Sequence, residues 1–275
     1  MNQTNDSPLT VVKLGGTEGV DFSAICQDIP ALLAESQRLV LVHGGSAEAN
    51  TLGQALGKPP RFITSPSGFT SRYTDLPTLE IFAMAVNGKV NTFLVQQLQT
   101  LGVNAIGLSG LDGRLMVATR KTAIQSVEHG KRKIIRDDYT GKIEEINADL
   151  VNLLLAAGYT PVIAPMALSP QGEALNVDAD RAAAMIAAAL QAHTLVLLTA
   201  VPGLMRKFPD ESTLIQTLSE DQIETALGYA EGRMKKKVLG ATEALALGVR
   251  QVIFSDGRVE QPIHRALSGK GTVID

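Results

Sequence analysis

Apolar and polar positions alternate in blocks along the first part of the chain, and the blocks predict strands and helices in turn. Leu9–Leu14 and Leu39–Val42 are short apolar runs with the length and composition of buried strands. Ile25 and Ile29 recur at helical spacing between them, and Ala47–Leu56 again has a helical pattern. Because parallel neighbouring strands need crossover connections, this alternation predicts an α/β fold: a mainly parallel central sheet with helices on both faces, in three layers.

The pattern changes after residue 59. Arg61–Asp75 mixes turn residues with β-formers and predicts a hairpin that carries polar side chains. Leu76–Leu101 has the pattern of one long amphipathic helix, with a bend expected at Gly88. Asn104–Leu108 is a further strand. Short β-like runs between Arg114 and Ile146, separated by turns at residues 129–131 and 139–142, predict antiparallel hairpins.

The strand and helix alternation returns in the last part of the chain. The predicted strands are Tyr159–Ala164, Thr194–Thr199 and Arg250–Phe254, and the predicted helices are Asp178–Leu190 and Glu231–Leu247. The sequence has no Pro/Gly/Ser-rich linker and no internal repeat. We therefore expect two lobes built on one continuous sheet, within a single domain of residues 1–275.

Composition excludes several classes of protein. The chain has 275 residues, 45% of them hydrophobic and 19% charged, which excludes a disordered chain. A single Cys, Cys26 on the apolar face of the first helix, excludes a disulfide scaffold and favours a reducing, cytoplasmic compartment. The longest apolar run, Ala182–Ala192, is too short to span a membrane, and Met1–Pro8 lacks the pattern of a signal peptide. The net charge of −3 argues against a nucleic-acid partner.

Two of the predicted strands end in glycine pairs. Gly15 and Gly16 follow the first strand, and Gly44 and Gly45 follow the second. Glycine lets backbone N–H groups approach an oxyanion closely, and open α/β sheets bind ligands at the carboxyl ends of their strands. Lys13 stands within the first strand, where an anionic partner would offset the cost of burying its charge. The alternative is an edge-strand lysine whose amine reaches water. The sequence has neither a P-loop nor a Rossmann glycine pattern.

Two polar clusters precede or begin predicted helices. Asn176, Asp178 and Asp180 alternate before the Ala-rich helix. Helix capping accounts for one of the three, and the others could contact a substrate, orient a lysine or hold Mg²⁺ indirectly. Lys235, Lys236 and Lys237 stand near the start of a later helix, where basic residues oppose the helix dipole unless an anion binds there. We expect Lys235 and Lys236 to face solvent and one lysine to turn inward.

Together the motifs resemble a known family. VVKLGG, HGGS, LNVDAD and GRMKKKVLGA occur in the order found in the amino-acid kinase superfamily, acetylglutamate-kinase-like branch, across nearly the whole chain. PPRFITSPSGFTSRYTD, NAIGLSGLDGRL, DDYTGKIEEIN and DGRVEQPIHRALSGKGTVID are similar to the subgroup that phosphorylates 2-aminoadipate attached to an amino-group carrier protein, in lysine biosynthesis. The resemblance implies the amino-acid kinase fold, ATP and Mg²⁺, and an acylphosphate product.

The resemblance also implies roles for individual residues. Lys13 and Lys237 would neutralise the transferred phosphoryl group, and Asp180 would orient both lysines. The substrate would be bound by Gly44, Gly45, Arg72 and Asn176, with Arg72 on its α-carboxylate. Because a side-chain carboxylate is already ionised at pH 7, the reaction needs no general base, and we expect His43 to be structural. No protein side chain is expected to bind a metal.

The nucleotide would bind in the second lobe. The residues expected to contact it are Gly15, Gly16, Thr199 and Gly203. The first lobe, about residues 9–165, would bind substrate and carrier, and the second, about residues 166–275, would bind nucleotide. Two positions depart from the family pattern: Ala200 stands where a polar residue is frequent, and Ser46 where acetylglutamate kinases have a third glycine. Ser46 at this position is consistent with the subgroup that acts on a carrier-bound substrate.

Charge is distributed unevenly along the chain. Arg114–Lys142 holds eight Lys or Arg and three Asp or Glu, a net charge of +5, whereas the remaining residues sum to −8. Such a region suits a small acidic carrier protein as partner, although a solvated charged hairpin would have the same composition. The family further implies a homodimer through the helix of residues 76–101. Two other functions stay open: a kinase for free acetylglutamate or carrier-bound glutamate in arginine or ornithine synthesis, and a non-catalytic amino-acid-sensing regulator.

Overall fold

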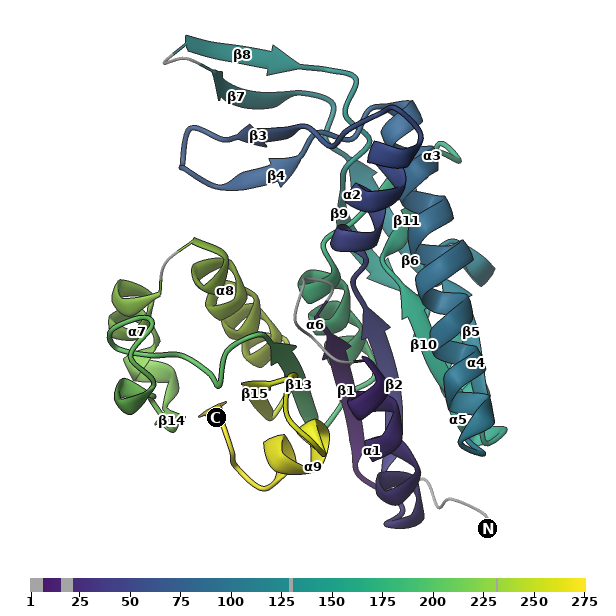
Figure 1. Cartoon of the computed structure of the whole chain (residues 1–275), viewed down its shortest axis with the longest axis vertical. Coiled ribbons are helices and arrows are strands. Elements are labelled where there is room, and N and C mark those ends of the chain that lie inside the picture. The colour runs from purple at the N-terminus through teal and green to yellow at the C-terminus, as the bar shows by residue number, and fades with distance from the viewer. Residues whose placement is uncertain (1–6, 16–21, 129–130, 231) are drawn as a thin grey trace.

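An eight-stranded sheet forms the centre of the molecule (Figure 1). The computed structural model describes residues 7–15, 22–128, 131–230 and 232–275. The strand order is β14-β16-β15-β13-β1-β2-β10-β5. The bounds are β1 (Leu9–Leu14), β2 (Arg38–His43), β5 (Ala105–Ser109), β10 (Thr160–Ala164), β13 (Thr194–Thr199), β14 (Thr217–Leu218), β15 (Gln251–Asp256) and β16 (Thr272–Ile274). Neighbouring strands are parallel except β15 and β16, so the expected mainly parallel sheet is confirmed.

Helices cover both faces of this sheet and make the expected three layers. The helices are α1 (Phe22–Ala34), α2 (Ser46–Ala55), α3 (Leu76–Ala83), α4 (Thr92–Thr100), α5 (Ala148–Ala156), α6 (Ala179–Ala189), α7 (Ile223–Tyr229), α8 (Gly232–Ala246) and α9 (Pro262–Leu267). One core cluster packs α1, α4 and α9 against Val12 and Leu14 of β1. A second packs α5, α6 and α8 against Leu9 and Val11. Successive strand residues face opposite sides, so Lys13 faces the side of α6.

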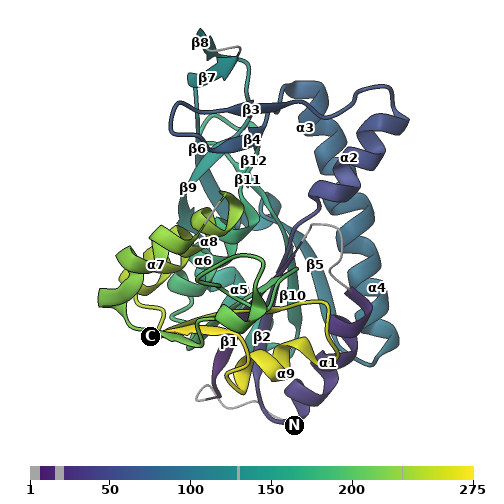
Figure 2. The ribbon, with the colours of Figure 1, turned by 60° about the vertical axis from the view of Figure 1, so that its left-hand side comes forward.

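Three smaller sheets lie beside the central one. The four-stranded sheet has the order β12-β11-β6-β9, and β3–β4 and β7–β8 are two-stranded antiparallel hairpins. Their bounds are β3 (Phe62–Thr64), β4 (Thr70–Arg72), β6 (Met116–Arg120), β7 (Ile124–Glu128), β8 (Lys131–Ile135), β9 (Gly141–Ile146), β11 (Met166–Leu168) and β12 (Ala174–Asn176). The hairpin predicted over residues 61–75 and the one that pairs residues 124–128 with 131–135 are confirmed, and both lie at the end of the molecule opposite α9 (Figures 1 and 2). The turn predicted at residues 139–142 does not join a hairpin, because β9 pairs with β6 rather than with β8.

The long helix is continuous in sequence but not uniform. Asp75 begins it by accepting a hydrogen bond from the Thr78 amide at 3.0 Å. Between α3 and α4 the chain forms a π-helical segment, η1 (Met84–Asn91), which includes Gly88. A wider helical turn therefore stands at the place where a bend was expected.

Several short elements carried no usable sequence pattern. They are α5, α7 and α9, the strands β11, β12, β14 and β16, and the 3₁₀ turns η2 (Asp112–Arg114), η3 (Glu211–Thr213) and η4 (Glu220–Gln222). Cys26 is buried in the core, as expected. Among the described residues, no helix has the length and apolar character needed to cross a membrane. Three parts of the sequence analysis fall outside the described residues: Gly16, most of the polar N-terminus, and residues 129–130 of the predicted turn.

Candidate functional site

The carboxyl ends of three neighbouring strands bring the predicted site residues together. Lys13 and Gly15 stand at the end of β1, Gly44 and Gly45 follow β2, and Thr199 ends β13. Within the sheet, β1 lies between β13 and β2, and Lys13 is in register with a residue of each. Lys13 is therefore in the middle of the sheet, which excludes the edge-strand alternative.

Two lysines share one carboxylate at this edge. The Lys13 amine is 2.8 Å from Oδ1 of Asp180, and the Lys237 amine is 2.6 Å from Oδ2. Asp180 belongs to the first turn of α6, the helix that covers the face of β1 on which Lys13 stands, and Lys237 comes from α8, which packs against α6. The side chains of Lys13 and Lys237 are only 7% and 16% exposed. Of the three lysines near the start of α8, Lys237 is the one that turns inward to Asp180.

The electrostatics of this cluster favour an anion. Burial would raise the pKa of Asp180, but the charges of Lys13 and Lys237 and their hydrogen bonds hold it well below its usual range. Burial and the charge of Lys13 lower the pKa of Lys237. Asp180 acts to raise this pKa, but its effect is smaller. Two ammonium groups on one carboxylate leave an excess positive charge at a buried position. A phosphoryl oxygen can compensate that charge.

The other members of the alternating cluster have separate tasks. Asp178 caps α6 by accepting from the amides of Asp180 and Arg181 at 2.9 and 3.0 Å. Asn176 ends β12, and its amide group donates to Oγ1 of Thr74 at 3.1 Å. Capping thus accounts for one of the three predicted residues, as the sequence indicated, and the chain separates the remaining two to different sides of the site.

Arg72 is a buried cation held by neutral acceptors. It is 8% exposed, and its guanidinium donates to the carbonyl and hydroxyl oxygens of Ser46 at 3.1 and 3.2 Å and to Oδ1 of Asn50 at 2.6 Å. Within the described part of the chain, no carboxylate lies in ion-pair range of it. Burial lowers the pKa of Arg72, yet arginine stays protonated in proteins. Three neutral acceptors orient the guanidinium, and its charge is available to a bound anion. Ser46, which departs from the family pattern, is one of these acceptors.

The two glycines after β2 differ from each other. The Gly44 amide donates to the Leu14 carbonyl at 3.1 Å, so in this structure it is not available to a ligand, contrary to expectation. The Gly45 amide, which leads into α2, has no acceptor among the described residues. A Cβ on Gly45 would lie 2.6 Å from Cγ1 of Val86 in η1. The absence of a side chain therefore serves close packing here as well as backbone access.

His43 is structural in this arrangement. It is fully buried, Nδ1 contacts the Gly44 carbonyl at 2.9 Å, and Nε2 lies 3.0 Å from the amide nitrogen of Asn91. Asn91 is itself held by a bond to the Val162 carbonyl. Burial lowers the pKa of His43 to about 4. The hydrogen bond to Gly44 acts to raise this pKa, and the charge of Lys13 acts to lower it. The ring is neutral at pH 7 and both nitrogens are engaged.

The residues predicted to contact nucleotide lie at the same edge. Thr199 is buried, and its hydroxyl donates to the Val201 carbonyl at 2.7 Å, which stabilises the turn after β13. A Cβ on Gly203 would be 2.6 Å from Oγ1 of Thr272, so close packing explains this glycine. Gly15 is buried directly after β1, and Gly16 lies outside the described residues.

Asp138 is a residue that the sequence analysis missed. It is fully buried, and its carboxylate accepts from the amide of Thr74 at 2.9 Å and from the amide and hydroxyl of Thr140 at 2.8 and 2.5 Å. Thr74 in turn receives the bond from Asn176. Asp138 thereby joins the loop after β4, which follows Arg72, to the strand end that carries Asn176. Two adjacent acids in a β-rich segment gave no signal that one of them is buried.

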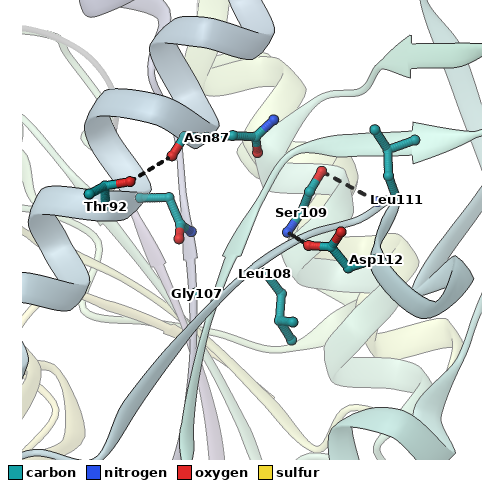
Figure 3. Close-up of a pocket in the computed structure, with 8 residues that line it drawn as sticks. Asn87, Thr92, Gly107, Leu108, Ser109, Leu111 and Asp112 are labelled. Atoms are coloured by element: carbon teal, nitrogen blue, oxygen red, sulfur yellow. Dashed lines mark hydrogen bonds between the residues drawn. The ribbon is translucent and has the colours of Figure 1, made fainter.

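The cavity drawn in Figure 3 is separate from this cluster. It has a volume of about 410 Å³ and lies between η1 and β5. Its lining residues are Asn87, Asn91, Thr92, Gly107, Leu108, Ser109, Leu111 and Asp112. None of the residues predicted for the site lines this cavity.

The residues present do not form a metal site. In the described ranges no three His, Cys, Asp or Glu side chains gather as metal ligands would. Both oxygens of Asp180 are engaged by lysines. The protein side chains at this edge therefore do not fit Mg²⁺ as direct ligands.

Comparison with known proteins gives full-length matches. The model of the amino acid kinase family matches residues 8–256. A "[LysW]-aminoadipate kinase" of Deinococcus radiodurans is 54% identical over 97% of this chain and 91% of its own. A protein of the same name from Thermus thermophilus is 54% identical over 97% of this chain and 100% of its own. A relative from Nitrosopumilus maritimus, named for both aminoadipate and glutamate on LysW, is 43% identical over 97% of this chain and 99% of its own.

Solved structures share the fold. N-acetylglutamate synthase from Neisseria gonorrhoeae, complexed with coenzyme A and N-acetyl-glutamate, superposes with a TM-score of 0.79 at 27% identity. The match covers 97% of this chain and 59% of that one, so this chain corresponds to part of the larger enzyme. Carbamate kinase from Giardia lamblia bound to AMP-PNP has a TM-score of 0.71 at 16% identity, with 98% and 99% of the two chains covered.

Proposed function

The chain belongs to the amino acid kinase family, and from this membership we propose that it uses ATP to phosphorylate the side-chain carboxylate of 2-aminoadipate attached to an amino-group carrier protein, in lysine biosynthesis. The observation that carries the proposal is the pair of buried lysines on Asp180, a charge arrangement suited to phosphoryl transfer. The full-length relatives named [LysW]-aminoadipate kinase, at 54% identity, support the substrate.

The reaction follows from the charges at the strand ends. A carboxylate oxygen of aminoadipate attacks the γ-phosphorus of ATP, the bond from that phosphorus to the β,γ-bridging oxygen breaks, and ADP leaves with the electron pair. The carboxylate is already ionised, so no proton has to be removed. Lys13 and Lys237 offset the negative charge of the transferred group, and Asp180 holds both amines in place. The product is an acylphosphate.

The remaining predicted residues position the two substrates. Arg72 would bind the α-carboxylate of aminoadipate, a planar anion that suits its guanidinium. Asn176 and the Gly45 amide would contact the substrate. Gly15, Gly16, Thr199 and Gly203 would border the nucleotide. A lobe of about residues 166–275 would supply most of the nucleotide site, and residues 9–165 would bind substrate and carrier. Mg²⁺ would arrive bound to the phosphates of ATP, since phosphates are its frequent ligands in kinases. A reducing cytoplasm is consistent with the single Cys.

The carrier protein would dock on the basic region. The β7–β8 hairpin projects beside the β3–β4 hairpin that ends in Arg72 (Figure 1). On β8, Lys131, Arg132 and Lys133 are exposed. Arg120 is less exposed, pairs with Glu173 at 2.6 Å and stacks on the Tyr139 ring at 3.7 Å. The other basic residues of 114–142 are exposed as well, and the hairpin is the part of this region that projects from the molecule.

A homodimer would form along the helix of residues 76–101. Met84 and Phe93 on this helix are 49% and 60% exposed, and β5 ends the central sheet beside it. Exposed large apolar side chains next to an open strand edge are typical of an interface. Sedimentation equilibrium would give a dimer mass for the wild type and a monomer mass for Met84→Glu/Phe93→Glu.

One comparison of substrates tests the proposed function. ADP release is measured with carrier-bound aminoadipate, carrier-bound glutamate and free acetylglutamate. We expect the first to be the best substrate, with kcat/KM about 10–200-fold above carrier-bound glutamate, the range that one methylene in a pocket produces. Turnover of free acetylglutamate alone would refute the carrier proposal, and no turnover with any of the three would favour an amino-acid sensor.

A further inference from the structure

Lys236 is half-buried and makes a specific contact that the sequence analysis did not predict. Its amine donates to the carbonyl of Thr70 at 2.8 Å and lies 5.3 Å from the centre of the Phe69 ring. Both partners belong to the tip of the β3–β4 hairpin, 166 residues away in the sequence from Lys236. Lys235, one position earlier in α8, is exposed, as expected.

The hairpin needs support from outside. Each of its strands has three residues, and a two-stranded hairpin of this size is marginal by itself in water. Its base is held because Arg72, at the end of β4, is hydrogen-bonded to Ser46 and Asn50 of α2. Its tip lies over the first turns of α8 (Figure 1), where Lys236 contacts it.

The contact links the two sides of the candidate site. Arg72 is two residues from Thr70 on β4, and Lys237 is the neighbour of Lys236 on α8. An extended strand and a helix point consecutive side chains in different directions. Lys237 therefore turns to Asp180 at 2.6 Å while Lys236 turns to the hairpin, and one helix turn serves both contacts.

We propose that Lys236 is a positioning residue that ties the tip of the β3–β4 hairpin to α8, so that Arg72 and Lys237 are held at a fixed separation around one substrate. The chemistry of the contact is a charge-assisted hydrogen bond to a backbone carbonyl together with a cation–π contact, both within the range in which such interactions stabilise. The kinetic part of this inference rests on the proposed function, whereas the structural part does not.

Hydrogen–deuterium exchange of the full chain tests the structural part without any substrate. Lys236→Ala is expected to speed exchange in peptides that cover residues 62–72 and to leave α6 and the central strands unchanged. Lys235→Ala, which removes an exposed charge from the same helix turn, should leave the hairpin like the wild type. Equal hairpin exchange in the wild type and in Lys236→Ala would overturn the proposal.

Steady-state kinetics with carrier-bound aminoadipate test the positioning role. Lys236→Ala should raise KM for that substrate by about tenfold, the loss expected for one charge-assisted contact, with kcat and KM for ATP close to wild type. Lys236→Arg, which keeps a cation and its donors, should restore KM. In a double-mutant cycle, the effects of Lys236→Ala and Phe69→Ala on KM should not be additive, because the two side chains act through one contact. The effects of Lys235→Ala and Phe69→Ala on KM should be additive.

The outcomes separate this proposal from the proposed function. A wild-type protein that does not turn over carrier-bound aminoadipate would refute the function, and the exchange experiment would still decide the hairpin contact. A raised KM with unchanged hairpin exchange, or additive effects of Lys236→Ala and Phe69→Ala, would mean that Lys236 contacts the substrate directly and would overturn the positioning role.

Discussion

At the scale of single residues, Asp180 determines the charge of the candidate site. Both lysines bind it, with amines at 2.8 and 2.6 Å from its two oxygens. Against the effect of burial, the lysines hold its pKa well below the usual range, so it is ionised at neutral pH. Removing either lysine leaves Asp180 paired with the other, which makes each lysine separately testable.

Lys13→Ala should lower kcat on the order of 10²–10³-fold, the loss typical for one preorganised donor to developing negative charge. KM for both substrates should change little, because the lysine acts on the group in transfer. Steady-state ADP release measures both constants, and a thermal melt controls for folding. A kcat near that of the wild type would contradict the assignment of Lys13.

His43 makes stability depend on pH in a defined direction. Its folded pKa of about 4 lies below its ordinary 6.5, so between these values the unfolded chain binds more protons than the folded one. Stability should therefore fall by about 3 kcal/mol as pH drops through this window. His43→Gln should lose this component, measured as urea midpoints of both proteins from pH 7 to pH 4.5.

The difference between the two proteins separates the effect of His43 from that of His264, whose pKa is also shifted. Although burial acts against it, the hydrogen bonds that His264 makes to the carboxylates of Asp28 and Glu35 raise its pKa. The contribution of His264 has the opposite sign, because it is present below the unfolded pKa and lost as pH rises through the folded one. Parallel pH profiles for the wild type and His43→Gln would refute the assignment to His43.

At the scale of elements, the turn after β2 and the π-helical segment η1 depend on each other. Gly45 packs so closely on Val86 that a Cβ would approach Cγ1 to 2.6 Å. His43 at the end of β2 meets Asn91 at the end of η1 at 3.0 Å. The wider helical turn thus carries the residues that fix the glycine turn, and a regular α-helix would place them differently.

Gly45→Ala should destabilise the protein by about 1–3 kcal/mol, the usual range for overpacking. The φ of Gly45 is −170°, outside the left-handed region that favours glycine, so the loss arises from the contact with Val86. Gly45→Ala/Val86→Ala should recover part of it. Gly88→Ala is the matched control, because a Cβ there meets nothing within 4 Å. Urea unfolding measures all four proteins, and a Gly45→Ala protein as stable as the wild type would contradict the packing.

At the scale of the whole molecule, the net charge of the region that includes the β7–β8 hairpin is opposite in sign to that of the remaining residues. Residues 114–142 carry a net charge of +5 and the remainder −8. Three of the exposed basic residues of this region lie on β8, next to the hairpin that holds Arg72 (Figure 2). A partner attracted to this end would bring a tethered substrate close to the strand ends where Lys13 and Asp180 meet.

Reversing Lys131, Arg132 and Lys133 to Glu should slow association with the carrier protein by about tenfold or more at low salt, and the difference should shrink as salt is added. Stopped-flow mixing measures the association rate. A variant with the same number of reversals at the exposed Arg206, Lys207 and Lys270 controls for total charge. An unchanged rate at low salt for the hairpin variant would argue against this docking surface.

The strands could be predicted because the apolar pattern that specifies a buried strand lies in consecutive residues. Leu9–Leu14 and Thr194–Thr199 are apolar runs that form β1 and β13 with the predicted bounds. The family expected from VVKLGG and LNVDAD is confirmed by the match to residues 8–256. The elements that were missed, such as α9 and β12, are six and three residues long, and their formation depends on tertiary contacts rather than on a pattern.

The sequence by itself determined the layered α/β architecture, the family, and the residue types that carry charge, because apolar periodicity and glycine turns are properties of neighbouring residues. The tertiary structure alone decided which charges meet. It paired Lys13 with an aspartate of α6, turned Lys237 inward and Lys236 to the β3–β4 hairpin, and buried Asp138. Contacts between residues distant in the chain depend on how the layers pack, and no local pattern contains that information.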